Sequence, residues 1–204
     1  MNVSTENDTH ENEAQPPTRE DAYRRLFADV HDDAVRFAIR RAPDLDADEA
    51  VSTAMLTAWR RLDDAPADLD GRRAWVFGIV RKTLLNDRRA RGRRDALAVR
   101  VATDAELGVA SSDGLAVTEL RLDVVRAWRS LSDAQQEVLA LAVFEQLDHA
   151  RAATVLGIRE GAYRVRLTRA RAALRVALGD ASESEPSLLA DLSTALTPSV
   201  RKEV

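Results

Sequence analysis

The chain has 204 residues, a length that suits one or two domains, and 31% of these residues are charged whereas only 4% are aromatic. The absence of cysteine excludes a disulfide framework, a thiolate nucleophile and a cysteine-based zinc site. The polar N-terminus does not read as a signal peptide, and no run approaches the roughly 18 apolar residues of a membrane span. We therefore expect a cytoplasmic protein, and the prevalence of Leu, Ala, Val, Arg, Asp and Glu favours an all-α fold.

Charge is distributed unevenly along the chain, although the formal net charge is only -4. Residues 72–100 carry ten basic and two acidic side chains, and residues 159–175 carry six basic side chains and one acidic side chain. We call these segments the first and the second basic island. Solubility does not require such blocks, whereas two separate contacts with a polyanion would. The charge pattern alone also allows an alternative, in which the basic islands are arginine-rich helix faces that contact only solvent.

Three helices are predicted in residues 18–95, after a polar segment of residues 1–17 that we expect to be disordered. The first helix begins near Thr18, and its predicted inner face consists of Tyr23, Leu26, Phe27, Val30, Ala34, Phe37 and Ala38. Asp46 is placed to cap a second helix, with Glu49 three positions later. The predicted inner face of this second helix consists of Val51, Ala54, Met55, Ala58 and Leu62.

The third helix of this first domain runs from about Arg72 to Arg89 and coincides with most of the first basic island. Its predicted inner face consists of Trp75, Val76, Ile79, Val80 and Thr83. Residues 90–114 follow with little periodicity, and within them we assign residues 96–114 to a flexible linker. The 25 residues from 90 to 114 would reach about 80–90 Å when fully extended.

A second helical domain is predicted for residues 115–178, with a C-terminal tail at 179–204. After a helix that contains Val124, Ala127 and Leu131, the tetrapeptide "SDAQ" from Ser132 is a capping box. Asp148 is placed to cap a short helix, and Gly157 suits the left-handed position that follows a helix. We expect the two domains to fold as separate modules, each with a small core of its own.

The second basic island combines with the short helix before it into a helix-turn-helix. With Tyr163 at zero and about 100° per residue, the apolar side chains fall within roughly 40° of it. These side chains are Leu167, Ala170 and Leu174. The opposite face, between roughly 100° and 240°, carries Arg164, Val165, Thr168 and Arg169. The last long helix is therefore predicted to bury one stripe and to present arginines on the other side.

Such a face is typical of a helix that enters the major groove of DNA. Arginine can donate two hydrogen bonds to guanine, and a good pair is worth about 1–3 kcal/mol of discrimination. Val165 and the methyl group of Thr168 can contact a thymine methyl group. Arg166, Arg171 and Arg175 lie nearer the flanks, where contact with phosphate is expected.

The segment from Leu131 to Leu174 resembles the C-terminal domain of the sigma-70 family, specifically the extracytoplasmic function (ECF) group. Its "LSDAQQEVLAL" is similar to the family's Leu-Pro-x-x-Gln-x-Glu-Val helix. Its "ATVLGI" and "GAYRVRLTRARAAL" resemble Ala-x-x-Leu-Gly-Ile and Gly-Thr-Val-Lys-Ser-Arg-Leu-x-Arg-Ala-Arg-x-x-Leu. A looser resemblance covers about Asp21–Arg94 through "AMLTAWRRL" and "RRAWVFGIVRKTLLNDRRARGRR".

This resemblance implies two small helical domains, of which the first binds core RNA polymerase and the −10 promoter element and the second binds the −35 element. The −35 contacts that it implies, together with flanking arginines, are Arg159, Arg164, Val165, Arg166, Thr168 and Arg169. The implied −10 contacts are Arg72, Arg73, Lys82, Asn86, Arg88 and Arg89. The implied contacts with core polymerase are Glu49, Ser52, Leu56, Trp59 and Arg60. The resemblance also allows an anti-sigma factor as a partner, but no residue pattern in the sequence indicates one.

Two other functions fit the same pattern. The chain could be a stand-alone helix-turn-helix regulator with residues 18–95 as a dimerisation or sensor unit, or an interaction protein whose basic islands bind acidic partners. An enzyme is not expected, because His10, His31 and His149 are far apart and no glycine-rich phosphate loop is present. We accordingly expect no catalytic residue, no metal and no cofactor.

Overall fold

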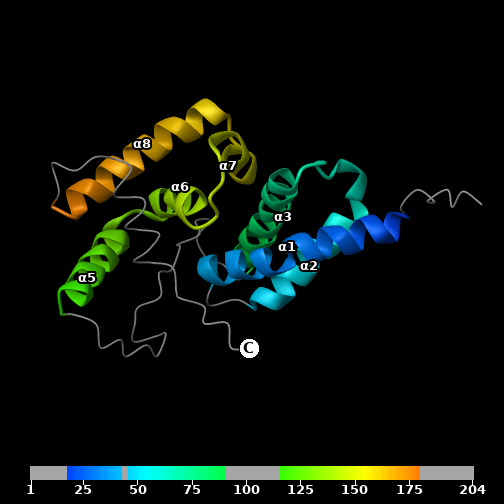
Figure 1. Cartoon of the computed structure of the whole chain (residues 1–204), viewed down its shortest axis with the longest axis horizontal. Helices are drawn as coiled ribbons and strands as arrows, with labels where there is room; N and C mark the ends of the chain where they lie inside the picture. Colours follow the sequence, from blue (N-terminus) through cyan, green and yellow to red (C-terminus); the bar gives the residue numbers. More distant parts are fainter. Residues whose placement is uncertain (1–17, 43–45, 91–114, 180–204) are drawn as a thin grey trace, which may run out of the picture.

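The computed structural model describes residues 18–42, 46–90 and 115–179, and all regular structure within these ranges is helical. The predicted all-α fold is therefore confirmed. In chain order the elements are α1 (Arg19–Arg41), α2 (Ala47–Arg60), the 3-10 turn η1 (Leu62–Asp64), α3 (Leu69–Ala90), α5 (Leu115–Ser130), α6 (Asp133–Val143), α7 (His149–Leu156) and α8 (Glu160–Ala177). The predictions for residues 1–17, for the linker at 96–114 and for nearly all of the C-terminal tail lie outside the described residues. Figure 1 shows α1 to α3 as one group and α5 to α8 as a second group.

The first half begins with a capping box that the sequence did not single out. The Thr18 side chain accepts a hydrogen bond from the Asp21 backbone N–H, and the Asp21 carboxylate accepts one from the Thr18 backbone N–H. Asp46 caps α2 as predicted, because its side chain accepts from the Glu49 N–H. The predicted inner face of α1 is buried except at its start, where Tyr23 is half-buried and Phe27 is 40% exposed.

The inner face of α3 is wider than predicted. Trp75 and Thr83 are only half-buried, whereas Phe77 and Leu84 are completely buried. Phe77 stacks on Phe37 of α1 with ring centroids 4.6 Å apart. The reason is that α3 packs against α1 and α2 and also against α7. The predicted inner face assumed that α3 is covered on one side only, and it is therefore too narrow.

The caps of the second half lie where the sequence places them. Ser132 and Gln135 form the predicted capping box of α6. The Asp148 side chain accepts from the Arg151 N–H at 2.8 Å at the start of α7. Gly157 ends α7 with φ 66° and ψ 36°, the left-handed geometry that favours glycine. These residues fix the turn between α7 and α8, and so they fix the direction of α8.

Removing the α7 cap provides a test of this local assignment. Asp148→Ala should lower the free energy of unfolding by about 1 kcal/mol, because two N–H groups at the start of the helix lose an acceptor. Asp148→Asn should cost only a few tenths of this, because asparagine is an equally good cap. Urea denaturation followed by circular dichroism measures both changes, and an equal loss in the two variants would contradict the capping role.

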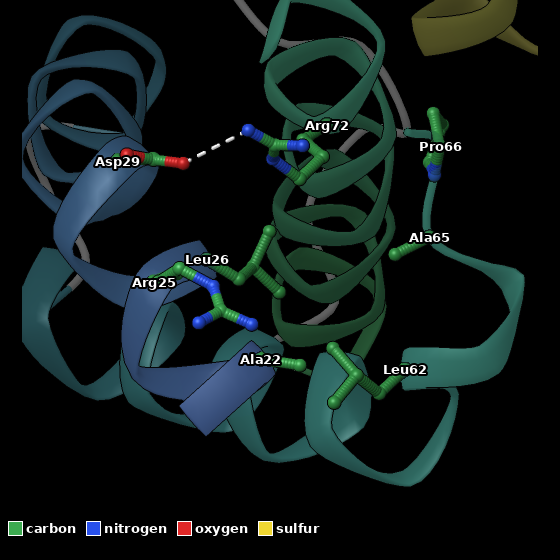
Figure 2. Close-up of a pocket in the computed structure, with 8 residues that line it drawn as sticks. All are labelled: Ala22, Arg25, Leu26, Asp29, Leu62, Ala65, Pro66 and Arg72. Carbon is green, nitrogen blue, oxygen red and sulfur yellow. Dashed lines mark hydrogen bonds and ion pairs between the residues drawn. The ribbon is translucent and has the colours of Figure 1, made fainter. Parts of the chain in front are cut away.

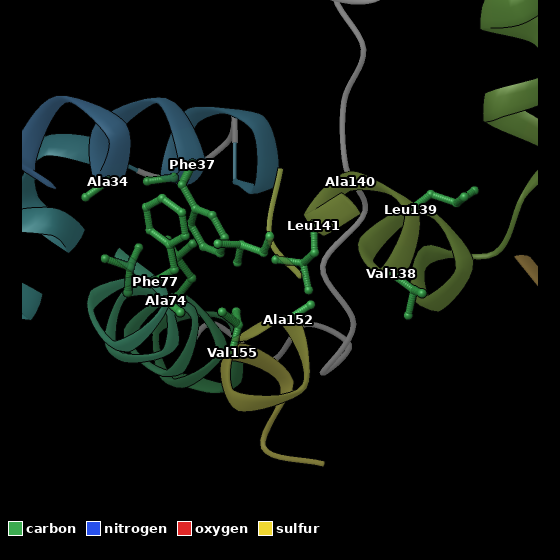
Figure 3. Packing of buried hydrophobic residues seen from close by; sticks show 14 of the residues in the cluster. Ala34, Phe37, Ala74, Phe77, Val138, Leu139, Ala140, Leu141, Ala152 and Val155 are labelled. Carbon is green, nitrogen blue, oxygen red and sulfur yellow. The ribbon is translucent and has the colours of Figure 1, made fainter. Parts of the chain in front are cut away.

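The expectation of two separate cores is wrong. The buried apolar residues of both halves form one continuous cluster. Figure 3 shows Leu141 and Val155 of the second half on the side that faces Phe37 and Phe77 of the first half. Apolar side chains on α3, α6 and α7 can cover one another. Two small domains that pack together in this way bury more apolar surface than each domain buries alone.

Candidate nucleic-acid interface

α8 has two distinct faces in the structure. Tyr163, Leu167, Ala170 and Leu174 are buried, which confirms the predicted inner stripe. The Tyr163 hydroxyl donates a hydrogen bond of 3.0 Å to the Val138 carbonyl oxygen of α6. This bond and the stripe fix the rotation of α8 about its axis.

The opposite face of α8 is exposed as predicted. Its exposed side chains are Arg164, Val165, Thr168 and Arg169. Arg159, the N-cap residue of α8, and Arg166 are also exposed, nearer the flanks of the buried stripe. Val165 is 51% exposed, so its apolar side chain is free to contact a thymine methyl group. Arg171 and Arg175 are half-buried at the edge of this face, in agreement with the flanking position predicted for them.

Arg164 does not extend freely from this face. Its guanidinium pairs with the Glu160 carboxylate one turn earlier on α8. This contact was not predicted, although an acidic residue four positions before an arginine on a helix favours such an ion pair. Glu160 restricts the rotamers of Arg164 and therefore orients the guanidinium before any ligand binds.

Alkaline pH offers a test of the Tyr163 anchor. Burial raises the pKa of the Tyr163 hydroxyl to about 12 from its ordinary value of 10. Because the neutral form is favoured in the folded chain, this contribution to stability is complete below pH 10 and is lost between pH 10 and 12. Tyr163→Phe should lose about 1 kcal/mol at pH 7 and should lack that alkaline loss. Denaturant titrations of both chains at pH 7 to 11.5 measure the difference, and parallel pH curves would contradict it.

The structure brings three of the six predicted −10 residues together. Lys82, Asn86 and Arg89 fall within roughly 60° of one another on α3, at about 100° per residue, and all three are exposed. They form one polar and basic surface, which we call the α3 face.

The other three predicted −10 residues point elsewhere and already have partners. Arg72 pairs with Asp29 at 3.0 Å, and Arg73 pairs with Asp33 at 2.8 Å. Arg88 donates to the carbonyl oxygen of Arg41. These contacts tie α3 to α1, so the three arginines support the fold in this conformation.

The residues predicted to bind core polymerase share one side of α2. Glu49, Ser52, Leu56 and Arg60 are exposed, and Leu56 is 59% exposed. Trp59 is half-buried, because its ring meets the edge of Tyr23 at 5.2 Å. The Arg19 guanidinium lies over the same ring, 5.4 Å from its centre. This side of α2, with an apolar side chain among polar ones, resembles a surface that binds protein.

One pocket lies beside α3 and is drawn in Figure 2. Its volume is about 270 Å³, slightly below the roughly 300–1,000 Å³ of typical small-molecule sites. The lining residues are Ala22, Arg25, Leu26, Asp29, Leu62, Ala65, Pro66 and Arg72. The two arginines and the apolar residues that line this pocket do not form a catalytic arrangement.

Metal and membrane features are absent from the part of the chain that the structure describes. Within residues 18–42, 46–90 and 115–179, no three His, Cys, Asp or Glu side chains are grouped as metal ligands would be. Over the same ranges, no helix has the length and apolar character that a membrane crossing requires. The exposed, arginine-bearing face of α8 is thus the feature with the most specific chemistry. Helix α7, the turn at Gly157 and α8 have the helix-turn-helix arrangement that is found in DNA-binding proteins.

Comparison with known proteins narrows this class. Residues 121–174 match the family described as Sigma-70, region 4. The fold is similar to that of the sigma factor RpoE from Bartonella quintana, which was solved in complex with the anti-sigma factor NepR. The TM-score is 0.53 and the sequence identity is 23%, over 78% of this chain and 98% of that chain. No curated protein matches the chain. Residues 121–174 are therefore similar to Sigma-70 region 4, and the described part of the chain has the fold of that sigma factor, in agreement with the predicted resemblance.

Proposed function

We propose that the chain is a promoter-specificity subunit of RNA polymerase that directs initiation at promoters with −10 and −35 elements. The observation that carries this proposal is the orientation of α8, which buries Tyr163 and Leu167 and exposes Arg164 and Arg169. A helix with this arrangement can place two guanidinium groups against guanine edges in a major groove. The −35 element is the DNA that the matched region 4 would read.

The first half is proposed to supply the other two contacts. The α3 face offers Lys82 and Asn86 to the −10 element, and the exposed side of α2 offers Leu56 to the polymerase. Burying a leucine that is 59% exposed in the free chain would contribute roughly 1–2 kcal/mol to polymerase binding. Because DNA and polymerase are cytoplasmic in bacteria, this function places the chain in the cytoplasm.

The decisive experiment is run-off transcription with purified core polymerase and a promoter library. Transcription from a subset of promoters should require this chain, and the selected promoters should share two elements. Binding of duplex promoter DNA without polymerase, together with no stimulation of transcription, would favour the alternative of a stand-alone helix-turn-helix regulator.

Core binding is tested separately with a matched pair of variants. Leu56→Ser should weaken association with core polymerase roughly tenfold, because the side chain loses its apolar contact. Ile39→Ser is the control, since Ile39 is 53% exposed but lies on α1. Fluorescence titration of labelled chain with core polymerase measures both affinities, and equal affinities would contradict the α2 interface.

An anti-sigma factor is the third partner that we propose, because the RpoE of similar fold was solved with one. Such a partner would compete with core polymerase for this chain. Displacement of labelled chain from core polymerase by the candidate protein is the corresponding measurement, and formation of a ternary complex would count against it.

A further inference from the structure

Gly161, in the first turn of α8, is a glycine that the structure of the chain does not require. The positive-φ glycines of the described residues are Gly157 and Gly179, so the backbone at Gly161 is one that alanine can adopt. Among the residues that the structure describes, no atom beyond the adjoining helix backbone would lie within 4 Å of a Cβ atom added there. In the free chain this exposed glycine only makes α8 less favourable, because glycine is a poorer helix former than alanine.

Two other glycines have a reason within the chain. Gly157 ends α7 in the left-handed conformation, which a residue with a side chain rarely adopts. A Cβ atom added to Gly71 would lie 2.5 Å from a carboxylate oxygen of Asp68, so a side chain there has no room. Gly161 has neither reason, and the remaining structural explanation is a partner that approaches the helix backbone closely.

Gly161 lies in the middle of the exposed side of α8. At about 100° per residue, it is roughly 60° from Arg164 on one side and roughly 80° from Arg169 on the other. Val165 and Thr168 lie within roughly 40° of it. The Thr168 hydroxyl donates a 3.0 Å bond to the Arg164 carbonyl oxygen, so it stays close to the helix. The line between the two arginines therefore begins with no side chain and continues with short ones.

The ion pair of Arg164 limits how far this arginine reaches. Its guanidinium is bound to the Glu160 carboxylate, one turn earlier on α8, and so it is held back beside the first turn of the helix. A guanidinium in this position projects less far from the helix than one on an extended side chain. For the paired Arg164 to meet a guanine edge, the first turn of α8 must lie close to the DNA.

From these observations we infer that Gly161 sets how deeply α8 enters the DNA groove. Its missing side chain lets the first turn lie close enough for the Glu160-bound Arg164 to reach a guanine. This inference rests on the proposed function, and it makes Gly161 a positioning residue, because it acts through Arg164. Adding a side chain at this position is therefore expected to stabilise the fold and to weaken DNA binding.

Gly161→Ala tests these opposite effects directly. The melting temperature of the variant should rise by roughly 1–4 °C, because alanine restricts the unfolded chain and favours the helix. The affinity of the chain, bound to core polymerase, for a fluorescent −35 duplex from a selected promoter should fall at least threefold. The loss should be smaller for a scrambled duplex, because phosphate contacts depend less on the reach of Arg164. Calorimetry and fluorescence anisotropy measure these changes, and a more stable variant with unchanged affinity would overturn the inference.

Larger side chains separate a steric effect from an effect of charge. Gly161→Leu should weaken binding of the same duplex at least tenfold. Gly161→Arg adds a positive charge, which by itself would tighten binding to DNA. If depth of entry decides, this variant also binds more weakly than the wild-type chain, and tighter binding would overturn the inference.

Ala172 provides the matched control position on the same helix. It is exposed, lies within roughly 20° of Gly161 around α8 and is about 16 Å further along the helix axis. Because a recognition helix contacts bases mainly through its N-terminal part, Ala172→Leu should leave the affinity for the duplex unchanged. Equal losses from leucine at the two positions would show that the first turn has no special role and would overturn the inference.

A double variant tests the link to Glu160. Glu160→Ala releases Arg164, which can then extend toward DNA from a helix that lies further out. Glu160→Ala combined with Gly161→Ala should therefore lose less affinity than the product of the two single losses. Independent losses would contradict the dependence on the reach of Arg164.

The wild-type chain distinguishes failure of this inference from failure of the proposed function. If wild-type chain with core polymerase binds promoter and scrambled duplexes alike and supports no promoter-specific transcription, the proposed function is refuted, and this inference with it. If the wild-type chain is active and Gly161→Ala binds the promoter duplex equally tightly, only the role of Gly161 is refuted.

Discussion

Replacing Arg164 and Arg169 together by alanine is expected to reduce transcription from the selected promoters by about 30-fold or more. Each arginine can form a two-bond contact with guanine worth about 1–3 kcal/mol, and every 1.4 kcal/mol is a factor of ten. Both side chains are exposed, so their removal leaves the core of the second half unchanged. Run-off transcription at fixed salt measures the effect.

Two controls separate base reading from general charge. Arg126→Ala removes an exposed arginine of α5, whose side chain is 74% exposed, and should leave transcription unchanged. Arg166→Ala should weaken binding at all promoters alike and should reduce the log–log salt slope by about 0.9, as expected for one phosphate contact. A uniform loss across promoters for Arg164→Ala would contradict a base-reading role for that residue.

The pairing between Glu160 and Arg164 sharpens this prediction. Because the acid orients the guanidinium in the free chain, Glu160→Ala should relax the preference at the base that Arg164 reads. An exposed pair of this kind contributes little to stability, so the unfolding free energy should change by less than about 1 kcal/mol. Glu160 is consequently a residue that positions Arg164 and does not read DNA by itself.

The second large effect is expected in the shared core. Phe77→Ala should lower the free energy of unfolding by about 3–5 kcal/mol, because Phe77 is completely buried and stacks on Phe37. The cluster that contains Phe77 extends into α6 and α7. The thermal transition of the second half should therefore shift down together with that of the first half.

Phe27→Ala is the matched control for this core substitution. Phe27 is 40% exposed and stacks on His31 at the surface, so its loss should cost much less than that of Phe77. Calorimetry of the three chains measures the transitions. Two transitions, with only the first shifted by Phe77→Ala, would show that the halves unfold independently in solution.

The sequence by itself determined the local structure and the orientation of the recognition helix. Asp46, Ser132, Asp148 and Gly157 lie at the predicted helix ends, because capping depends on residues three positions apart. The periodicity around Tyr163 correctly separated the buried stripe of α8 from its exposed arginines. The helix-turn-helix could be predicted because short-range spacing encodes all of these features.

Only the tertiary structure decided how the halves meet. Glu137 pairs with a residue 56 positions away, and Glu145 pairs with residues 104 and 105 positions away. The local sequence around Arg41 and Phe77 does not show whether these side chains face their own domain or the other domain. Periodicity reports which side of a helix is apolar, whereas the partner that covers it depends on the packing of the whole chain. That is why the sequence predicted the two helical domains but not the shared cluster of buried residues that joins them.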